Sequence, residues 1–296
     1  MAGPLIECVA NFSAGRDAAV VKDIVDAIAS SSGVVVLRSE MDHDHNRSVV
    51  TFVGPPDAVA EGALRGIGAA VERIDLRKHS GVHPRIGAAD VVPFVPIEGV
   101  TLADCVAIAH RTGEEVWKRF HVPVYFYEAA AKVPERRLLE NCRRGEFENP
   151  SIPPDLGGPA LHHSAGAVII GARKILIAFN INLATDDITI ARAIAKKIRT
   201  SSGGMPFVKA LGLPLAERGL VQVSMNLTDY EETPVHVVFD AVAREAAAHG
   251  VAVAGSEIIG LIPKRVLEDA AVHYLKCENF ERGLVLENRI ASALGR

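Results

Sequence analysis

The order of predicted strands and helices is the same in the two halves of this chain, and this repeat restricts the possible folds more than any other feature. Each half has two strands of β-branched residues between two amphipathic helices, with a further strand at either end. The predicted strands are 5–9, 34–37, 49–53, 91–95, then 175–182, 208–213, 220–226 and 251–262, and the predicted helices are 17–31, 55–74, 186–201 and 234–249. The sequence therefore predicts an α+β fold of two ferredoxin-like (βαββαβ) α/β-sandwich subdomains, 1–172 and 173–296, with a substrate groove between them.

Several segments extend or interrupt this pattern. A helix at 102–120, a strand at 122–127 and a short helix at 134–144 are predicted to extend the first half. The polar tract 39–46 is predicted to separate two strands, and the Pro- and Gly-rich stretch 147–163 is predicted to be a long loop. Long loops in compact domains are commonly functional or act as linkers.

Composition indicates a soluble protein. The 296 residues are 49% hydrophobic and 23% charged, and the net charge of -4 argues against bulk attraction to nucleic acid or anionic membranes. The four cysteines are far apart and form no CxxC pair, and no secretory signal or membrane-spanning stretch is recognisable. We therefore expect a cytoplasmic location. The motifs GxxxxGK[ST], GxGxxG and GxSxG are absent, so nucleotide binding and a nucleophile elbow have no support.

His83 is the leading catalytic candidate. It lies in the stretch 78–88, where Gly81, Gly87 and Pro84 indicate a loop that can approach a ligand closely. Imidazole titrates near neutral pH, so this histidine is a candidate general acid or base. The cations Arg77, Lys78, His79 and Arg85 surround it in sequence. The alternative is a polar surface turn.

Two further segments could carry chemistry. The run 42–47 (Asp-His-Asp-His-Asn-Arg) contains metal-ligating residue types, but consecutive residues cannot all converge on one ion, and a hydrated turn is the alternative. In a third interpretation, one carboxylate and Asn46 or Arg47 hold a substrate. The glycine-rich segment 157–166 could approach a flat ligand, or it could be a linker. Its residues are Gly157, Gly158, Pro159, Ala160, Leu161, His162, His163, Ser164, Ala165 and Gly166.

Several ordered motifs resemble one family. The stretches 7–13, 45–49, 51–56, 81–88, 171–174, 177–183 and 255–261 closely resemble glutamate formimidoyltransferases. The resemblance covers nearly the whole chain and is to the stand-alone transferase, so the cyclodeaminase activity of the bifunctional animal enzymes is expected to be missing.

The resemblance implies a specific reaction. The family transfers a formimino group from N-formimino-L-glutamate to N5 of tetrahydrofolate, a step of histidine degradation and one-carbon metabolism. It implies that His83 is the catalytic histidine, that 157–166 binds folate, and that the protein is a homodimer. We expect no metal and no nucleotide cofactor. Glu40 is a candidate to orient the amidinium group. Asn46, Arg47, Arg85, Arg173 and Lys174 are candidates to hold the substrates, the cations by binding carboxylates.

The residues leave three other functions open. One is formyl transfer between 5-formyltetrahydrofolate and glutamate, which needs the same groove and histidine. Another is a non-catalytic module that binds amino acids or folate. The last is a metal-dependent amidine hydrolase that uses the acidic and histidine residues of 42–45.

Overall fold

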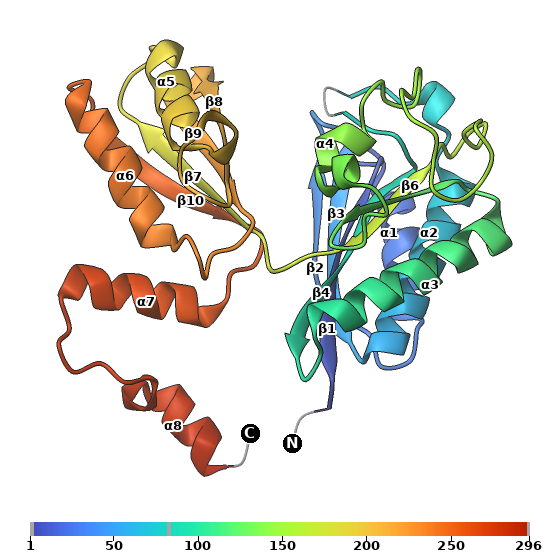
Figure 1. Ribbon diagram of the computed structural model, residues 1–296, viewed down its shortest axis with the longest axis horizontal. Coiled ribbons are helices and arrows are strands. Elements are labelled where there is room, and N and C mark those ends of the chain that lie inside the picture. Colours follow the sequence, from blue (N-terminus) through green and yellow to red (C-terminus); the bar gives the residue numbers. More distant parts are fainter. Residues whose placement is uncertain (1–2, 82–83, 295–296) are drawn as a thin grey trace. The chain divides into compact units, whose positions relative to one another are not determined.

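The computed structural model describes residues 3–81 and 84–294, and its chain divides into two compact units (Figure 1). The first unit ends at Arg173 and the second begins at Lys174. Each unit contains one β-sheet with helices packed against it, so the predicted α+β class is confirmed.

The first unit contains a six-stranded sheet in the order β2-β3-β1-β4-β6-β5. Strand β1 is antiparallel to β3 and to β4, whereas β4, β6 and β5 are mutually parallel. The strands are β1 (Leu5–Phe12), β2 (Val35–Asp42), β3 (Arg47–Gly54), β4 (Ala89–Glu98), β5 (Val124–Glu128) and β6 (Val168–Ala172). The first four occur in the predicted chain order, and the last two extend the sheet.

Helices α1 (Ala18–Ala29), α2 (Pro56–Arg73) and α3 (Leu102–Phe120) cover one face of this sheet (Figure 1). Alternate residues of β1, among them Ile6, Cys8 and Phe12, are buried against them. Helix α1 begins after Asp17, whose carboxylate accepts a hydrogen bond from the Ala19 amide at 2.9 Å. A reciprocal capping box between Thr101 and Asp104 fixes the start of α3.

The opposite face of the sheet is partly covered by the segment that contains η2 (Pro134–Arg137) and α4 (Leu139–Cys142). Tyr125, Tyr127, Ile169 and Cys142 form a second buried cluster there. Because side chains alternate along a strand, Glu7, Val9 and Asn11 of β1 point to this same face. The short helix η1 (Leu76–Lys78) precedes β4, and its Leu76 belongs to the core on the helix side.

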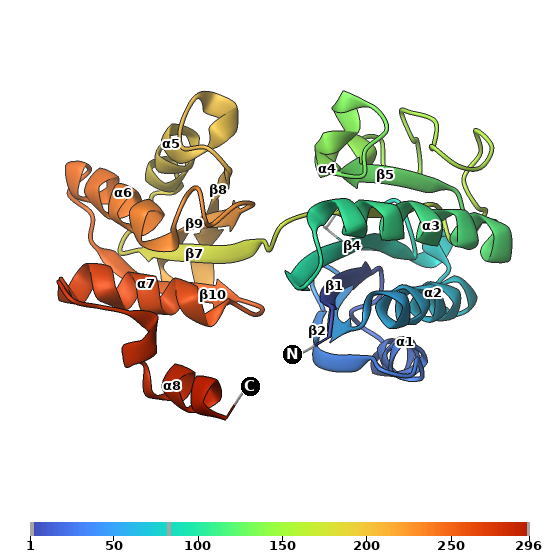
Figure 2. The same ribbon diagram turned by 60° about the horizontal axis from the view of Figure 1, so that its bottom comes forward.

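The second unit contains a four-stranded antiparallel sheet in the order β10-β7-β9-β8. Its strands are β7 (Ile177–Leu183), β8 (Val208–Leu215), β9 (Leu220–Leu227) and β10 (Val253–Ile259). Numbered within each unit, this order is the same as that of β1 to β4. Helices α5 (Ile188–Ile198) and α6 (Val235–Ala248) lie side by side and pack on one face (Figure 2). Short helices η3 (Thr200–Ser202), η4 (Ala216–Arg218) and η5 (Arg282–Leu284) and helices α7 (Lys264–Leu275) and α8 (Leu286–Ala293) complete the unit.

Three local predictions were wrong in part. The polar tract 39–46 is not wholly a connection, because β2 continues to Asp42; β2 is an edge strand, where polar residues remain exposed. The predicted helix 134–144 is broken at Leu138, whose backbone is extended. Strand β6 was not predicted, since it is buried on both faces and its apolar run shows no alternation. None of the helices in the described ranges has the length and apolar character needed to cross a bilayer.

Candidate functional site

His83, the leading catalytic candidate, lies outside the described residues. The geometry of its loop is therefore given by the flanking residues on both sides, which the structure does describe. These flanks are fixed by side-chain hydrogen bonds to Asn46 and to Glu146 and Glu148.

Arg85 fixes the second flank of the loop. Its buried guanidinium donates from Nε to Nδ1 of His79 at 3.0 Å and from Nη2 to Oε1 of Glu148 at 2.6 Å. It also donates from Nη1 to Oε2 of Glu146 at 3.2 Å. These contacts join 79–85 to the segment around α4, and the two carboxylates compensate the positive charge of Arg85.

His79 is held as a neutral imidazole. Because Nδ1 accepts from Arg85, the ring proton resides on Nε2, which lies 3.0 Å from the carbonyl oxygen of Asn46. Burial lowers the pKa of His79, and the cations Arg85 and Arg16 lower it further, against the effects of the Asn46 carbonyl and Asp90.

Asn46 connects the first flank to the rest of the unit. Its side chain accepts from the Gly15 amide at 3.0 Å and donates to the carbonyl of Ser80 at 3.0 Å. Its φ of 49° is in the left-handed region, which asparagine tolerates better than most residues. A Cβ atom on Gly81 would lie 2.5 Å from the carbonyl oxygen of His45, so glycine is required for this close approach.

The glycine-rich segment 157–166 lies beside the same loop. Its Ser164 carbonyl accepts from the Leu76 amide at 2.8 Å, and its Ala165 carbonyl accepts from the Ala88 amide at 2.9 Å. The structure thus brings together the two segments that the sequence singled out separately. The segment's tip, Gly158 to Ala160, is exposed, whereas Ala165 and Gly166 are buried.

The two histidines of this segment lie together, with ring centroids 4.6 Å apart. Nδ1 of His162 accepts from the Ala165 amide at 3.1 Å, which shapes the turn that ends at Gly166. Burial, with help from His163 and His121, lowers the pKa of His162. Leu161 packs on the second buried cluster.

Charged side chains gather on the sheet face that carries Glu7 and Asn11. Arg47 donates from Nη2 to Oδ1 of Asn11, and burial, followed by repulsion from Arg143, lowers the pKa of Arg47 to about 10. Burial raises the pKa of Glu7, and Arg173 partly opposes this shift. The face therefore presents arginines with little water around them, a suitable environment for a carboxylate ligand.

Asp90 connects this charged face to the His83 loop. The buried carboxylate pairs with Nη2 of Arg143 at 2.5 Å and accepts from the Ile86 amide at 2.8 Å. Glu40 lies on β2, at the edge of the sheet. Its carboxylate accepts a hydrogen bond from the Arg38 guanidinium at 2.8 Å.

The run 42–47 forms a tight turn at the end of β2. Asp42 accepts from the backbone amide of His45 at 2.9 Å and lies 2.7 Å from its ring Nδ1. Over residues 3–81 and 84–294, no three His, Cys, Asp or Glu side chains converge as metal ligands would. The turn matches the Asx-type alternative considered for this run.

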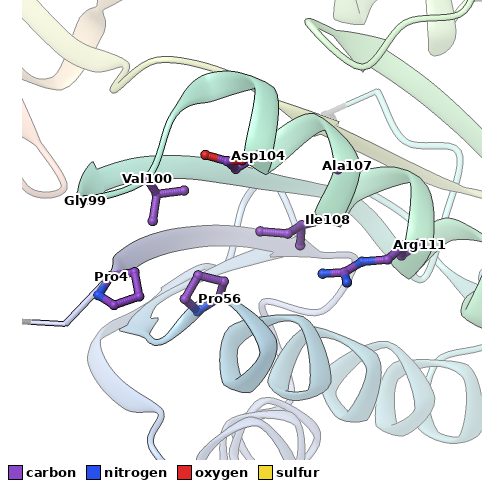
Figure 3. A pocket seen from close by; sticks show the side chains of 8 residues that line it. All are labelled: Pro4, Pro56, Gly99, Val100, Asp104, Ala107, Ile108 and Arg111. Carbon is purple, nitrogen blue, oxygen red and sulfur yellow. The ribbon is translucent and has the colours of Figure 1, made fainter.

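A shallow cavity of about 400 Å³ lies elsewhere in the first unit, between the starts of α2 and α3 (Figure 3). Its lining is mostly apolar, with Asp104 and Arg111 as polar groups. No candidate residue from the sequence lines this cavity, so it is separate from the site described above. The other lining residues are Pro4, Pro56, Gly99, Val100, Ala107 and Ile108.

Comparison with known protein families shows which family this chain belongs to. Residues 5–173 match the formiminotransferase domain, N-terminal subdomain, and residues 178–295 match the formiminotransferase domain. The chain belongs to the formiminotransferase family. It is 44% identical to a glutamate formimidoyltransferase of Thermoplasma acidophilum and 42% identical to one of Streptococcus pyogenes, with at least 97% of either chain covered. It is 41% identical to the formimidoyltransferase-cyclodeaminase of Rattus norvegicus, of which it covers 54%.

Several residues of this candidate site were not predicted from the sequence. Glu7, Asp90 and Arg143 are buried or half-buried charges, and Glu146 and Glu148 bind Arg85. A signal existed for the first two, because each is a single carboxylate within or beside an apolar strand. Such a residue rarely becomes buried without a partner. Arg143 carries no comparable signal in its polar segment.

Proposed function

We propose that this chain is a glutamate formimidoyltransferase, which transfers the formimino group of N-formimino-L-glutamate to N5 of tetrahydrofolate. The observation that carries this proposal is the identity of 42–44% over nearly the full length of relatives with that name. Tetrahydrofolate is then the co-substrate, and the reaction uses no metal and no nucleotide.

The proposed chemistry needs one proton relay. Attack of the N5 amine on the amidine carbon gives a tetrahedral intermediate, and the proton lost from N5 must reach the departing nitrogen of glutamate. An imidazole can accept the first proton and donate it to the second site, a contribution of about 10²- to 10⁴-fold to the rate. We assign this role to His83.

The scaffold around the loop supports that assignment. Asn46, His79 and Arg85 are linked by hydrogen bonds that fix the flanks of the loop on both sides. Hydrogen bonds of this kind hold a catalytic base in the orientation that the reaction needs before the substrate binds. The adjacent segment 157–166 is proposed to bind the folate, because its glycines and exposed tip allow a flat ring to approach.

The charged sheet face is proposed to bind the glutamate portion of the donor. Arg47 and Arg173 are assigned to its carboxylates, and Glu40 to the amidinium. Arg85 already contacts two carboxylates, so its proposed role is to position the loop rather than to bind substrate directly.

We propose further that residues 1–172 and 173–296 are two ferredoxin-like subdomains, and that the enzyme is a cytoplasmic homodimer. The shared strand order of the two units supports the ferredoxin-like topology of each unit. The homodimer and the location rest on the family alone.

The decisive experiment supplies N-formimino-L-glutamate and tetrahydrofolate and measures 5-formiminotetrahydrofolate through its acid conversion to the methenyl form. His83→Ala should lose turnover and still bind folate, whereas the matched variant His249→Ala should behave as wild type. Absence of product from well-folded wild type would refute the proposal.

Two further arms separate the alternatives. Product from 5-formyltetrahydrofolate and glutamate, without formimino transfer, would indicate the formyl reaction. Folate-independent release of formamide or ammonia that stops with EDTA would indicate a metal-dependent hydrolase. Binding without any product would indicate a non-catalytic module.

A further inference from the structure

The second unit carries a row of uncharged polar side chains on one face of its sheet. Ile177, Phe179, Ile181 and Leu183 of β7 pack with α5 and α6, so the alternate residues Asn180 and Asn182 point to the opposite face. Pairing with β9 and β10 places Gln222, Ser224 and Glu257 beside them. Asparagine is depleted in β-strands, so two asparagines on one face of β7 are unusual.

Glu257 is at the centre of a hydrogen-bond cluster on this face. Its Oε1 accepts from Asn182 Nδ2 at 2.8 Å and from Arg218 Nη1 at 2.8 Å. Gln222 donates from Nε2 to Oδ1 of Asn182 at 2.9 Å. The hydrogen bonds from Asn182 and Arg218 lower the pKa of Glu257, so its carboxylate stays ionised near neutral pH.

The amide pair is rigid as well as polar. Asn182 and Gln222 are only 2% and 6% exposed, although they lie on the face opposite the helices. Buried amides in a hydrogen-bonded network keep one orientation, so they present the carboxylate in a fixed direction.

Two acceptor atoms of the cluster have hydrogen-bonding capacity left. Within the described part of the chain, Oε2 of Glu257 receives only the long 3.4 Å contact from Gln222, and Oε1 of Gln222 accepts no hydrogen bond. Two acceptors from a carboxylate and an amide complement a planar group with two N–H donors.

We propose that Glu257, supported by Asn182 and Gln222, binds a planar N–C–N group that donates two hydrogen bonds. This inference rests on the proposed function, because both reaction partners carry such a group. In N-formimino-L-glutamate it is the amidine, and in tetrahydrofolate it is the 2-amino and N3 edge of the pterin ring.

The first unit has a counterpart of opposite charge. Asn11, at the end of β1, accepts from Arg47, just as Asn182, at the end of β7, accepts from Gln222. Each first strand therefore ends in a buried asparagine beside a charged side chain, Arg47 in one unit and Glu257 in the other. The charged side chain beside the asparagine is suited to bind an anion in the first unit, where it is Arg47. It is suited to bind N–H donors in the second unit, where it is Glu257.

The test uses full-length Glu257→Gln, which keeps the shape of the side chain and removes its charge. Isothermal calorimetry measures Kd for N-formimino-L-glutamate and for 5-formyltetrahydrofolate, with Glu217→Gln of the adjacent η4 as the matched control. We expect Glu257→Gln to raise one Kd by about 10- to 100-fold, the effect of losing a charge-assisted hydrogen-bonded pair. The control should leave both unchanged.

The identity of the weakened ligand decides the occupant. Loss of 5-formyltetrahydrofolate affinity, with p-aminobenzoylglutamate binding unaffected, assigns the site to the pterin edge. Loss of N-formimino-L-glutamate affinity assigns it to the amidine. If both Kd values stay within twofold of wild type, the proposal is overturned.

A second variant and a separate assay of turnover guard against misreading the calorimetry. Gln222→Met retains volume and removes the second acceptor, so it should weaken the same ligand, and it replaces Glu257→Gln if circular dichroism shows that variant unfolded. Turnover of wild type tests the proposed function separately, because calorimetry reports on this site whether or not transfer occurs.

Discussion

Arg85 donates a hydrogen bond from Nε to Nδ1 of His79 at 3.0 Å, and this contact closes the loop that carries the catalytic candidate. The two residues lie on opposite sides of His83 in sequence. His79 in turn contacts the Asn46 carbonyl, and Arg85 contacts Glu146 and Glu148, so the loop is tied to both β3 and the α4 segment.

Replacing Arg85 with lysine should destabilise this frame. Lysine cannot form the paired contact with Glu148 while also donating to His79, so we expect the free energy of unfolding to fall by about 1–3 kcal/mol. Misplacement of the loop should lower kcat by about 10-fold or more. Urea unfolding and steady-state kinetics measure both effects. The control Arg77→Lys, at an exposed pair with Asp75, should change stability by less than about 0.5 kcal/mol. Equal behaviour of the two variants would contradict the role of Arg85.

The neutral state of His79 predicts a pH dependence of stability. Its pKa is lowered in the fold, so the unfolded chain binds the proton first as pH falls below about 6.5. The free energy of unfolding should therefore decrease from pH 7 toward pH 5. His162 and His236 shift in the same direction, so the wild-type slope is a sum. The difference between wild type and His79→Gln isolates His79, and parallel stability curves would argue against this explanation.

Asn46 should be sensitive to both its side chain and its backbone. Asn46→Ala removes two hydrogen bonds and places alanine at a φ of 49°, so we expect a loss of about 2–3 kcal/mol of stability. Asn46→Gly loses the same hydrogen bonds without the backbone strain and should be about 1 kcal/mol more stable than the alanine variant. Thermal and urea unfolding of both variants provide the measurement. Equal stabilities would show that the strain is unimportant.

The buried Asp90–Arg143 pair should be costly to break on one side only. Arg143→Met leaves the Asp90 carboxylate buried without its cation, a loss of about 3–5 kcal/mol in the free energy of unfolding. The double variant Asp90→Asn/Arg143→Met removes both charges, and asparagine can still accept from the Ile86 amide. It should recover much of the loss in urea unfolding. A double variant no more stable than Arg143→Met would mean that the charge is not the cause.

Most of the fold was predictable because its elements have local signals. Helix α3 was predicted from its periodicity with both ends correct, and Asp17 and Pro56 mark the starts of α1 and α2. Strand β6 escaped prediction because a parallel strand buried on both faces lacks the alternating pattern. The break at Leu138 also has no local signal. Arg136, just before it, bonds to Pro153 and Asp155, which are distant in sequence.

The site was predictable in part for a related reason. The sequence by itself determined the α+β class, the repeated order of elements, the family and the segments 78–88 and 157–166, since each depends on residues close together in the chain. Only the tertiary structure decided that these two segments hydrogen-bond to each other, that Arg85 is paired with Glu146 and Glu148, and that Glu257 meets Asn182 and Gln222. Such contacts join residues tens of positions apart, and their partners depend on strand register and burial, which no local pattern specifies.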